Sequence, residues 1–87
     1  MTEPVLWRVE ITARAERDLL RLDEVTRKRV RQGIDRLAQG ETVDIRKIVG
    51  GDEYRLRVGD YRVRLSFHPE QRALIIRVLH RREAYRR

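Results

Sequence analysis

The stretch that decides the fold is residues 54–65, which read YRLRVGDYRVRL. Apolar residues and arginines alternate on both sides of Gly59-Asp60, and such alternation around a two-residue turn signal is typical of a β-hairpin. With this turn, Val58 lies opposite Tyr61 and every further pair along the two strands is fixed. One face of the predicted hairpin is apolar, and the other face carries Arg55, Arg57, Arg62 and Arg64.

Two pairs of arginines face each other across the predicted strands, Arg57 opposite Arg62 and Arg55 opposite Arg64. Like charges in directly opposite positions are destabilising, and at an effective dielectric constant near 20 two charges ~5 Å apart repel by roughly 3 kcal/mol. Folding does not require arginines in facing positions, but a bound anion would neutralise their charge. Because the guanidinium fork matches two phosphate oxygens at once, the pattern predicts a phosphate-binding surface. A solvated basic surface that serves only solubility is the alternative.

The positive charge is concentrated in the second part of the chain. The formal net charge is +7 over 87 residues. Residues 1–53 hold 11 Lys or Arg and 11 Asp or Glu, so they sum to zero, whereas residues 54–87 hold 10 Arg and three acidic residues. Such asymmetry indicates a nucleic acid or another polyanion as partner.

Composition excludes several kinds of site. The chain has no cysteine and only two histidines, His68 and His80, so we expect no disulfide, no metal site and no cofactor. It contains neither an apolar run of membrane-spanning length nor a signal-peptide pattern. We therefore expect a cytoplasmic protein without a membrane partner, and the length predicts one domain over residues 1–87.

The segments before the hairpin predict a strand followed by two helices. Alternation in residues 5–11 predicts the strand. Thr12 and Asp23 are suitable N-caps for two amphipathic helices, and Gly40 follows the second helix. Gly33 lies inside that helix and costs roughly 1 kcal/mol relative to alanine, so we expect a close approach to a neighbouring element there.

The remaining segments complete a sheet. Residues 44–49 fit either a loop or a short strand, and residues 74–80 are apolar enough for a well-buried strand. The predicted fold class is α+β, an antiparallel sheet of about four strands with the N-terminal helical hairpin packed on one face.

The order of these elements and two local motifs resemble the RelE/ParE toxin superfamily, and its RelE-like branch in particular. The resemblance covers nearly the whole chain and is most specific in residues 54–63, YRLRVGDYRV, and residues 80–85, HRREAY. It implies the toxin component of a type II toxin–antitoxin system, an endoribonuclease that cleaves messenger RNA on the ribosome without a metal ion. It also implies two partners, a cognate antitoxin protein that silences the toxin and the mRNA on the ribosome.

The resemblance also implies roles for particular residues. In the RelE-like branch, cationic residues on the central hairpin and near the chain end bind the scissile phosphate together with a tyrosine. The best-known member has lysine where this chain has Arg55 and Arg57. The matching positions here are Arg55, Arg57, Arg62, Arg81 and Tyr85.

Metal-free cleavage uses the 2′-hydroxyl of the RNA as nucleophile, so the protein must accept a proton and neutralise the charge that develops on the phosphate. We expect Arg57, Arg62 and Arg81 to neutralise that charge. Arginine, with a pKa above ~12, is a poor general base, so Tyr85 is the expected proton acceptor. The alternative for Tyr85 is a packing residue that holds the C-terminal turn in place. The predicted RNA-binding positions are Arg55, Arg64, Arg77, which shares strand parity with Arg81, and Lys47, just upstream of the hairpin.

Neither histidine is expected to be catalytic. His80 shares strand parity with Leu74, Ile76 and Val78, which we expect to face the helices, so a structural role is expected for it. His68 is expected to be a solvent-exposed loop residue.

Two other functions stay open. A ParE-like toxin inhibits DNA gyrase, and a basic module without catalytic activity binds RNA electrostatically, with no single indispensable arginine. In either toxin hypothesis, the basic face makes an acidic or partly disordered antitoxin segment that folds over the arginines physically reasonable.

Overall fold

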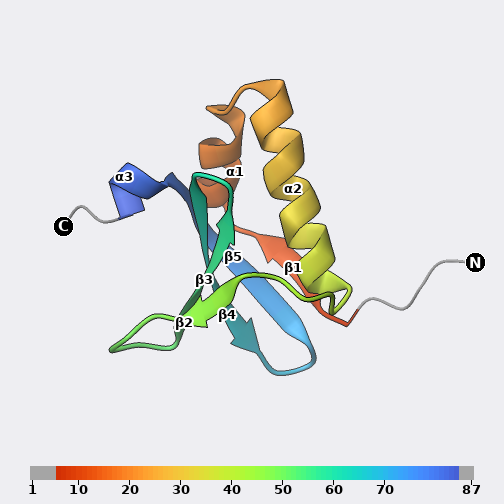
Figure 1. The fold of residues 1–87 in the computed structure, drawn as a ribbon. Helices are drawn as coiled ribbons and strands as arrows, with labels where there is room; N and C mark the ends of the chain where they lie inside the picture. The colour runs from red at the N-terminus through yellow and green to blue at the C-terminus, as the bar shows by residue number, and fades with distance from the viewer. Residues whose placement is uncertain (1–5, 85–87) are drawn as a thin grey trace, which may run out of the picture.

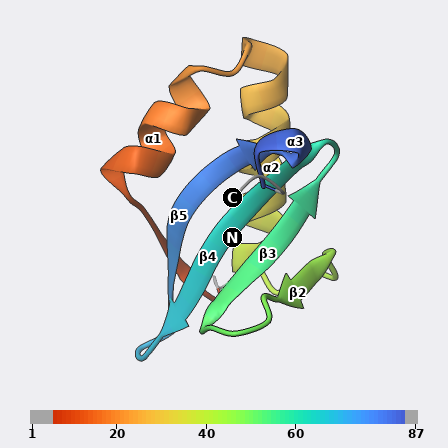
Figure 2. The same ribbon diagram turned by 90° about the vertical axis from the view of Figure 1, so that its left-hand side faces the viewer.

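The sheet has five strands in the order β1-β5-β4-β3-β2, and two helices cover one of its faces (Figure 1). A computed structural model describes residues 6–84. Figure 2 looks onto the sheet face away from α1 and α2, and the short helix α3 lies on that side, at the end of β5. The elements are β1 (Arg8–Ile11), α1 (Ala13–Leu20), α2 (Glu24–Ala38), β2 (Ile45–Lys47), β3 (Glu53–Val58), β4 (Tyr61–His68), β5 (Arg72–His80) and α3 (Arg81–Ala84).

The α+β class is confirmed, but the sheet differs from the prediction in strand number and direction. β1, which forms part of the strand predicted over residues 5–11, pairs with β5 in parallel, so the sheet is mixed. Only a tight hairpin forces antiparallel pairing, and the connection between β1 and β5 contains both long helices and three strands. The fifth strand is β2, within the ambiguous residues 44–49. Three residues are too few to show alternation, and β2 is defined by its pairing with β3.

β3 and β4 form the predicted hairpin in the predicted register. Val58 lies opposite Tyr61, and both arginine pairs face each other. Gly59 has a φ of +56°, in the left-handed region that favours glycine. Leu56 and Val63, on the apolar face of the hairpin, are buried, so this face packs toward the helices as predicted.

Both long helices begin at the predicted caps. Thr12 Oγ1 accepts a hydrogen bond from the Ala15 N–H (3.1 Å), and Asp23 Oδ2 accepts one from the Thr26 N–H (3.2 Å). These bonds satisfy donors that the first helical turn leaves unpaired. Hydrogen bonds from the side chain and backbone of Thr26 lower the pKa of the Asp23 carboxyl. Gly40 follows α2 with a φ of +76°, as expected for a helix end.

α2 approaches the hairpin closely at Gly33. A Cβ atom at this position would lie 2.6 Å from Cγ2 of Val58, which is closer than two carbon atoms pack. The glycine that is unfavourable for the helix is therefore explained by contact with the hairpin next to its turn.

The apolar core lies between the sheet and the two helices. At one end of it, Phe67 contacts Trp7 (4.4 Å between ring centroids) and Tyr54 (5.0 Å). Complete burial of one large apolar side chain stabilises a fold by about 1.5–3 kcal/mol. The largest fully buried side chains are Leu19, Val30, Leu56, Val63, Leu65 and Ile75.

β5 carries one extra residue relative to β4. Leu65 pairs with Ile75, but the preceding Arg64 pairs with Arg77, so Ile76 has no partner on β4. An extra residue of this kind is a β-bulge, and it changes the face to which the following side chains point.

The bulge contradicts the expected orientation of the first part of β5. Ala73 and Ile75 are fully buried in the core, whereas Leu74 and Ile76 are only partly buried. The expectation that Leu74 and Ile76 face the helices is therefore wrong, because it assumed uninterrupted alternation. Val78, after the extra residue, lies in the core as expected.

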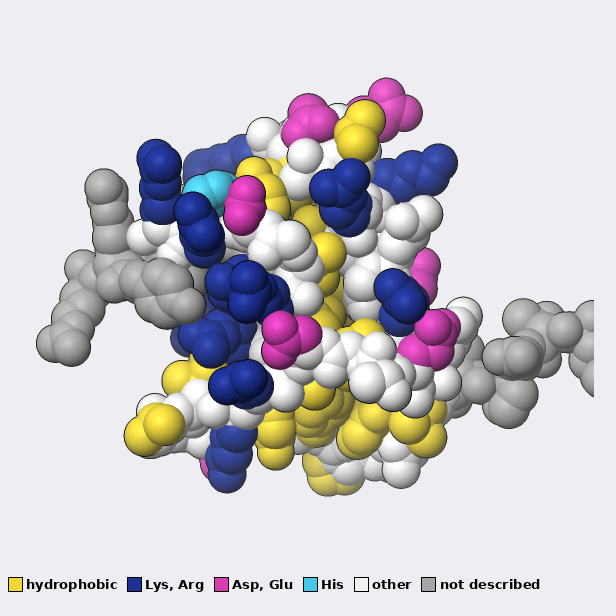
Figure 3. Space-filling view, viewed as in Figure 1, with side chains coloured by type: hydrophobic (Ala, Val, Ile, Leu, Met, Phe, Trp, Pro, Cys, Tyr) yellow, Lys and Arg dark blue, Asp and Glu magenta, His cyan; other side chains and the backbone are white. Residues whose placement is uncertain are grey.

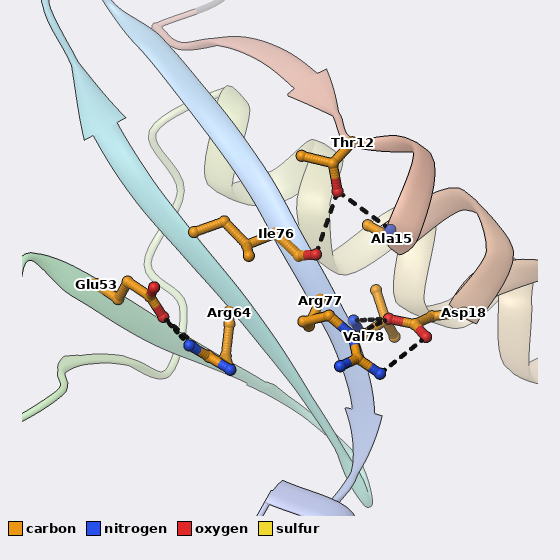
Figure 4. Close-up of polar contacts among 8 residues, drawn as sticks. All are labelled: Thr12, Ala15, Asp18, Glu53, Arg64, Ile76, Arg77 and Val78. Atoms are coloured by element: carbon orange, nitrogen blue, oxygen red, sulfur yellow. Dashed lines mark hydrogen bonds and ion pairs between the residues drawn. The ribbon is translucent and has the colours of Figure 1, made fainter.

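β5 extends past the end of β1, and α1 supplies partners for the edge that β1 leaves open (Figure 4). Thr12 Oγ1 donates a hydrogen bond to the carbonyl of Ile76 (3.2 Å), and Asp18 Oδ2 accepts one from the N–H of Val78 (2.9 Å). Unpaired strand edges attract further strands, and α1 covers this one.

Candidate nucleic-acid interface

The sheet face away from the helices carries a row of arginines across four strands. Arg46 of β2 lies opposite Arg55 of β3, Arg55 opposite Arg64 of β4, and Arg64 opposite Arg77 of β5. Neighbouring strands are ~4.8 Å apart, so this arginine row spans roughly 14 Å. The sequence predicted the Arg55–Arg64 pair, and the structure extends it by one residue on each side.

A second row lies two residues closer to the hairpin turn, where Arg57 is opposite Arg62. The backbone N–H of Arg57 donates a hydrogen bond to the carbonyl of Asp44 (2.9 Å). This bond extends the pairing of β2 and β3 by one residue, so Asp44 joins the second row.

Side chains from both rows line a pocket of about 160 Å³. This volume is smaller than the ~300–1,000 Å³ of typical small-molecule sites, so the pocket suits one phosphate group rather than a whole metabolite. Figure 3 shows Lys and Arg side chains gathered on this side of the molecule. We call it the arginine pocket, and its lining residues are Asp44, Arg46, Arg55, Arg57 and Arg62.

Arg62 lines the arginine pocket but is only 5% exposed, whereas the sequence predicted an open position on the basic face. Its Nη1 donates hydrogen bonds to the carbonyls of Gly59 (3.2 Å) and Tyr61 (3.1 Å). Its strand partner Leu79 is also buried, and α3 contacts both β4 and β5 at this end of the sheet. Arg62 therefore fixes the hairpin turn with one nitrogen, and the rest of its donor fork remains for the pocket.

The other two pocket arginines predicted from the hairpin differ in exposure. Arg57 is exposed, and Arg55 is half-buried. Arg57 is therefore the hairpin arginine most accessible to a ligand.

Two predicted RNA-binding arginines hold carboxylate partners. Arg64 donates Nε (2.8 Å) and Nη2 (2.5 Å) to Oε1 of Glu53. Arg77 donates Nε (2.9 Å) and Nη2 (3.3 Å) to the two carboxylate oxygens of Asp18 (Figure 4). An RNA phosphate would have to replace a carboxylate at each position.

The pair of Asp18 and Arg77 is largely buried, with 6% and 22% of the side chains exposed. Burial by itself would raise the pKa of the Asp18 carboxyl. Hydrogen bonds from Arg77 and from the Val78 N–H, together with the charges of Arg77 and Arg14, outweigh burial and hold the pKa below its usual value of 3.8. Arg77 thus stabilises the contact between β5 and α1.

Two further predicted residues, Arg81 and Lys47, are not among the residues that line the pocket. Arg81 begins α3, where its N–H donates to the carbonyl of Asp60 (2.7 Å) and its Nε lies 4.0 Å from Asp60 Oδ1. It is therefore next to the hairpin turn. Lys47 is exposed and lies opposite Tyr54, on the side of the sheet away from the arginine row. Tyr85 lies outside the described residues.

The two histidines make local contacts. His80 stacks edge-on against Tyr61, with ring centroids 5.3 Å apart, and its Nδ1 is assigned as acceptor of the Arg82 N–H (3.2 Å). His68 ends β4, is half-buried and forms a 2.6 Å hydrogen bond with the Ser66 hydroxyl, so the expectation of a solvent-exposed loop position is wrong.

Sequence reasoning missed two residues of the pocket, Arg46 and Asp44. Once residues 45–47 are known to form a strand, both fall on the same face, because side chains two positions apart share a face. The signal was therefore present but depended on recognising β2.

Two kinds of feature are absent from residues 6–84. This part of the chain contains no group of three or more His, Cys, Asp or Glu side chains that could hold a metal ion. None of its helices is long and apolar enough to cross a membrane.

The fold is similar to that of toxins solved with their antitoxins. Toxin chains in the RelB–RelE antitoxin–toxin complex of Methanococcus jannaschii and the RelE–RelB complex of Pyrococcus horikoshii are 29% and 28% identical, with TM-scores of 0.72 and 0.73. The similarities cover 86% and 87% of this chain and 93% and 96% of those chains. A chain of the RelBE2 toxin–antitoxin complex of Mycobacterium tuberculosis is 24% identical to this chain, with a TM-score of 0.73. The similarity covers 87% of this chain and 99% of that chain, and it shows a shared fold.

The sequence also matches a curated relative and a toxin family. A Methanocaldococcus jannaschii protein named as a candidate RelE1 toxin is 36% identical over 82 residues, which cover 88% of this chain and 91% of that protein. Residues 9–85 match the family described as the ParE toxin of type II toxin–antitoxin systems. This chain therefore belongs to that toxin family, within the RelE/ParE superfamily.

Proposed function

We propose that this toxin is a ribosome-dependent endoribonuclease whose arginine pocket binds the scissile phosphate of mRNA. The observation that carries this proposal is the pocket itself, where four guanidinium groups converge on a space of about 160 Å³. The similarity to RelE proteins also supports the proposal. Each of these matches exceeds 25% identity, so it indicates more than a shared fold.

In this proposal, the 2′-hydroxyl oxygen attacks the adjacent phosphorus and the 5′ oxygen leaves, without a metal ion. Arg55, Arg57 and Arg62 bind the phosphate oxygens and neutralise the charge that develops in the transition state. Loss of one such donor typically costs about 10²–10³-fold in rate. Arg81 and Tyr85, near the chain end, are proposed to complete the site.

Other cations are proposed to bind the neighbouring nucleotides. Arg64 and Arg77 would exchange their carboxylate partners for phosphate, while Lys47 would contact RNA that passes around the β2 edge of the sheet. Such contacts position the RNA and carry little sequence information.

A cognate antitoxin is the proposed protein partner, because the similar RelE chains occur in complexes with RelB. The charge asymmetry favours an acidic antitoxin segment that covers the arginine pocket. Action on the ribosome would place the toxin in the cytoplasm.

Inhibition of DNA gyrase is the second candidate, and the match to the ParE toxin family favours it. A toxin of this kind would bind its target without cleaving RNA. Growth arrest with DNA damage and intact transcripts would support this candidate. A basic module that only binds RNA would cleave neither mRNA nor DNA, and each arginine would contribute a similar small part of the affinity.

The test is cleavage of mRNA by the purified chain on programmed ribosomes, with new 5′ ends mapped. Arg57→Ala is expected to reduce the cleavage rate by about 10²–10³-fold, because Arg57 is an exposed pocket residue. The matched control is Arg29→Ala, an exposed arginine of α2 that is not among the residues lining the arginine pocket. Tyr85→Phe is expected to lose most of the activity. A wild-type chain that leaves mRNA intact would contradict the proposal.

A further inference from the structure

Among the described residues that line the arginine pocket, the carboxylate of Asp44 is the one group that can accept a proton. Guanidinium groups are donors only, so none of the four arginines can take the proton of a 2′-hydroxyl. We propose that Asp44, in place of the Tyr85 expected from the sequence, is the general base of the reaction. This inference rests on the nuclease function proposed above and names the residue that starts the chemistry.

The backbone fixes Asp44 beside the phosphate-binding arginines. Its carbonyl accepts the hydrogen bond from the Arg57 N–H (2.9 Å), and Arg57 lies opposite Arg62 in the next strand. Residues in facing positions of neighbouring strands have Cβ atoms ~4.5–5.5 Å apart. A phosphate held by Arg57 and Arg62 would therefore lie within one side-chain length of the Asp44 carboxylate.

Asp44 is less engaged than the other carboxylates beside the arginine row. Glu53 accepts two hydrogen bonds from Arg64, and Asp18 accepts bonds from Arg77 and from the backbone. The Asp44 carboxylate lies 3.9 Å from Arg46 Nε and is half exposed. That separation is an ion-pair contact rather than a hydrogen bond, so the carboxylate oxygens remain open to a substrate hydroxyl.

The proposed step is balanced in atoms and protons. Asp44 takes the proton of the 2′-hydroxyl, the 2′ oxygen forms a bond to phosphorus, and the bond from phosphorus to the 5′ oxygen breaks. Water supplies a proton to the departing 5′ oxygen, and Asp44 returns its proton to the solvent. The products are a 2′,3′-cyclic phosphate and a free 5′-hydroxyl.

A purely electrostatic role for Asp44 makes the opposite prediction. If Asp44 only offsets the charge of the pocket, Asp44→Asn would strengthen RNA binding and raise the cleavage rate together. If it is the general base, Asp44→Asn would bind RNA as tightly as the wild type or more tightly but cleave it about 10²–10⁴-fold more slowly. The substitution keeps the size of the side chain and the backbone bond to Arg57.

The experiment measures cleavage of mRNA on ribosomes and affinity for the same RNA, each across pH. The wild type is expected to lose cleavage activity toward acid pH, and Asp44→Asn to lack this dependence, while Asp44→Glu retains both activity and pH dependence. Asp35→Asn is the matched control, because it makes the same charge change at an exposed site on α2.

The outcomes separate this inference from the proposed function. An active wild type with an Asp44→Asn variant within about threefold of its rate would overturn the role of Asp44 and leave the nuclease function intact. A wild type that does not cleave would overturn both. Should Asp44→Asn fail to fold, Asp44→Glu decides, because loss of the pH dependence in a folded, active variant would also refute the general base.

Discussion

Oε1 of Glu53 accepts two hydrogen bonds from Arg64, from Nε at 2.8 Å and from Nη2 at 2.5 Å. The two residues lie on adjacent strands of the basic face, and their side chains are 33% and 39% exposed. In the free toxin, therefore, Arg64 is already neutralised by the protein itself, as Arg77 is by Asp18.

Glu53→Gln is expected to strengthen RNA binding, because Arg64 would no longer be held by a carboxylate. We expect an affinity gain of about 2- to 10-fold, equivalent to ~0.4–1.4 kcal/mol, and a salt dependence steeper by about 0.7 in log–log slope if Arg64 contacts one more phosphate. Titration of single-stranded RNA at several salt concentrations measures both quantities. Glu16→Gln is the control, since Glu16 pairs with Arg31 on the helical side of the molecule. An equal gain in both variants would show that only net charge matters.

Asp18→Asn is expected to lower the free energy of unfolding by about 1.5–3 kcal/mol at pH 7, the contribution of hydrogen bonds to a charged group. The substitution weakens the hydrogen bonds from Arg77 and from the Val78 N–H, which join β5 to α1. Since the pKa of Asp18 is lowered in the folded state, its stabilisation is complete above the unfolded value near 4 and is lost as the pH falls through the lower folded value.

Urea unfolding of the wild type and Asp18→Asn at pH 7 and near pH 3 tests this pH dependence of stability. The difference in stability between the two proteins is expected to shrink at the lower pH. A difference that stays constant would mean that the charge of Asp18 does not contribute and that only its shape matters.

Local features of the fold could be predicted, and features fixed by distant contacts could not. The hairpin was predictable because alternation and its turn lie within twelve consecutive residues, 54–65. The bulge at Ile76 is different, since the register of β5 is set by β4 and by the bonds from α1. The apolar run of residues 74–80 carries no local signal of the extra residue.

The same distinction applies to the candidate site. The facing arginine pairs followed from the hairpin register alone. The carboxylate partners of Arg64 and Arg77 lie 11 and 59 residues away along the chain, so their presence depends on the tertiary fold. Arg46 was missed because β2 has only three residues and is recognisable only by its pairing with β3.

Gly33→Ala is expected to destabilise the protein by about 1 kcal/mol. Overpacking typically costs ~1–3 kcal/mol, and the better helix propensity of alanine returns up to ~1 kcal/mol. The steric cost arises because the new Cβ would lie 2.6 Å from Cγ2 of Val58. Removing that methyl group should therefore reverse the sign of the effect.

A double-mutant cycle with Val58→Ala measures this coupling. In the Val58→Ala background, Gly33→Ala is expected to be stabilising by up to ~1 kcal/mol. If Gly33→Ala is equally destabilising in both backgrounds, the glycine is required for a reason other than its contact with Val58.

Arg62→Ala and Arg57→Ala are expected to differ in stability although both residues line the arginine pocket. Arg62 is buried and donates to two carbonyls of the hairpin turn, so its loss should cost about 1.5–3 kcal/mol. Arg57 is exposed, and its replacement should change stability by no more than ~0.5 kcal/mol. Thermal unfolding of the two variants, together with RNA titrations, separates the structural role of each arginine from its role in RNA binding.

Weaker RNA binding in a fully stable Arg57→Ala reports on the ligand contact alone, whereas the same loss of binding in Arg62→Ala also includes the effect of a loosened turn. If Arg62→Ala is as stable as Arg57→Ala, the bonds to the turn contribute nothing measurable, and Arg62 is held in its buried position solely as a ligand for phosphate.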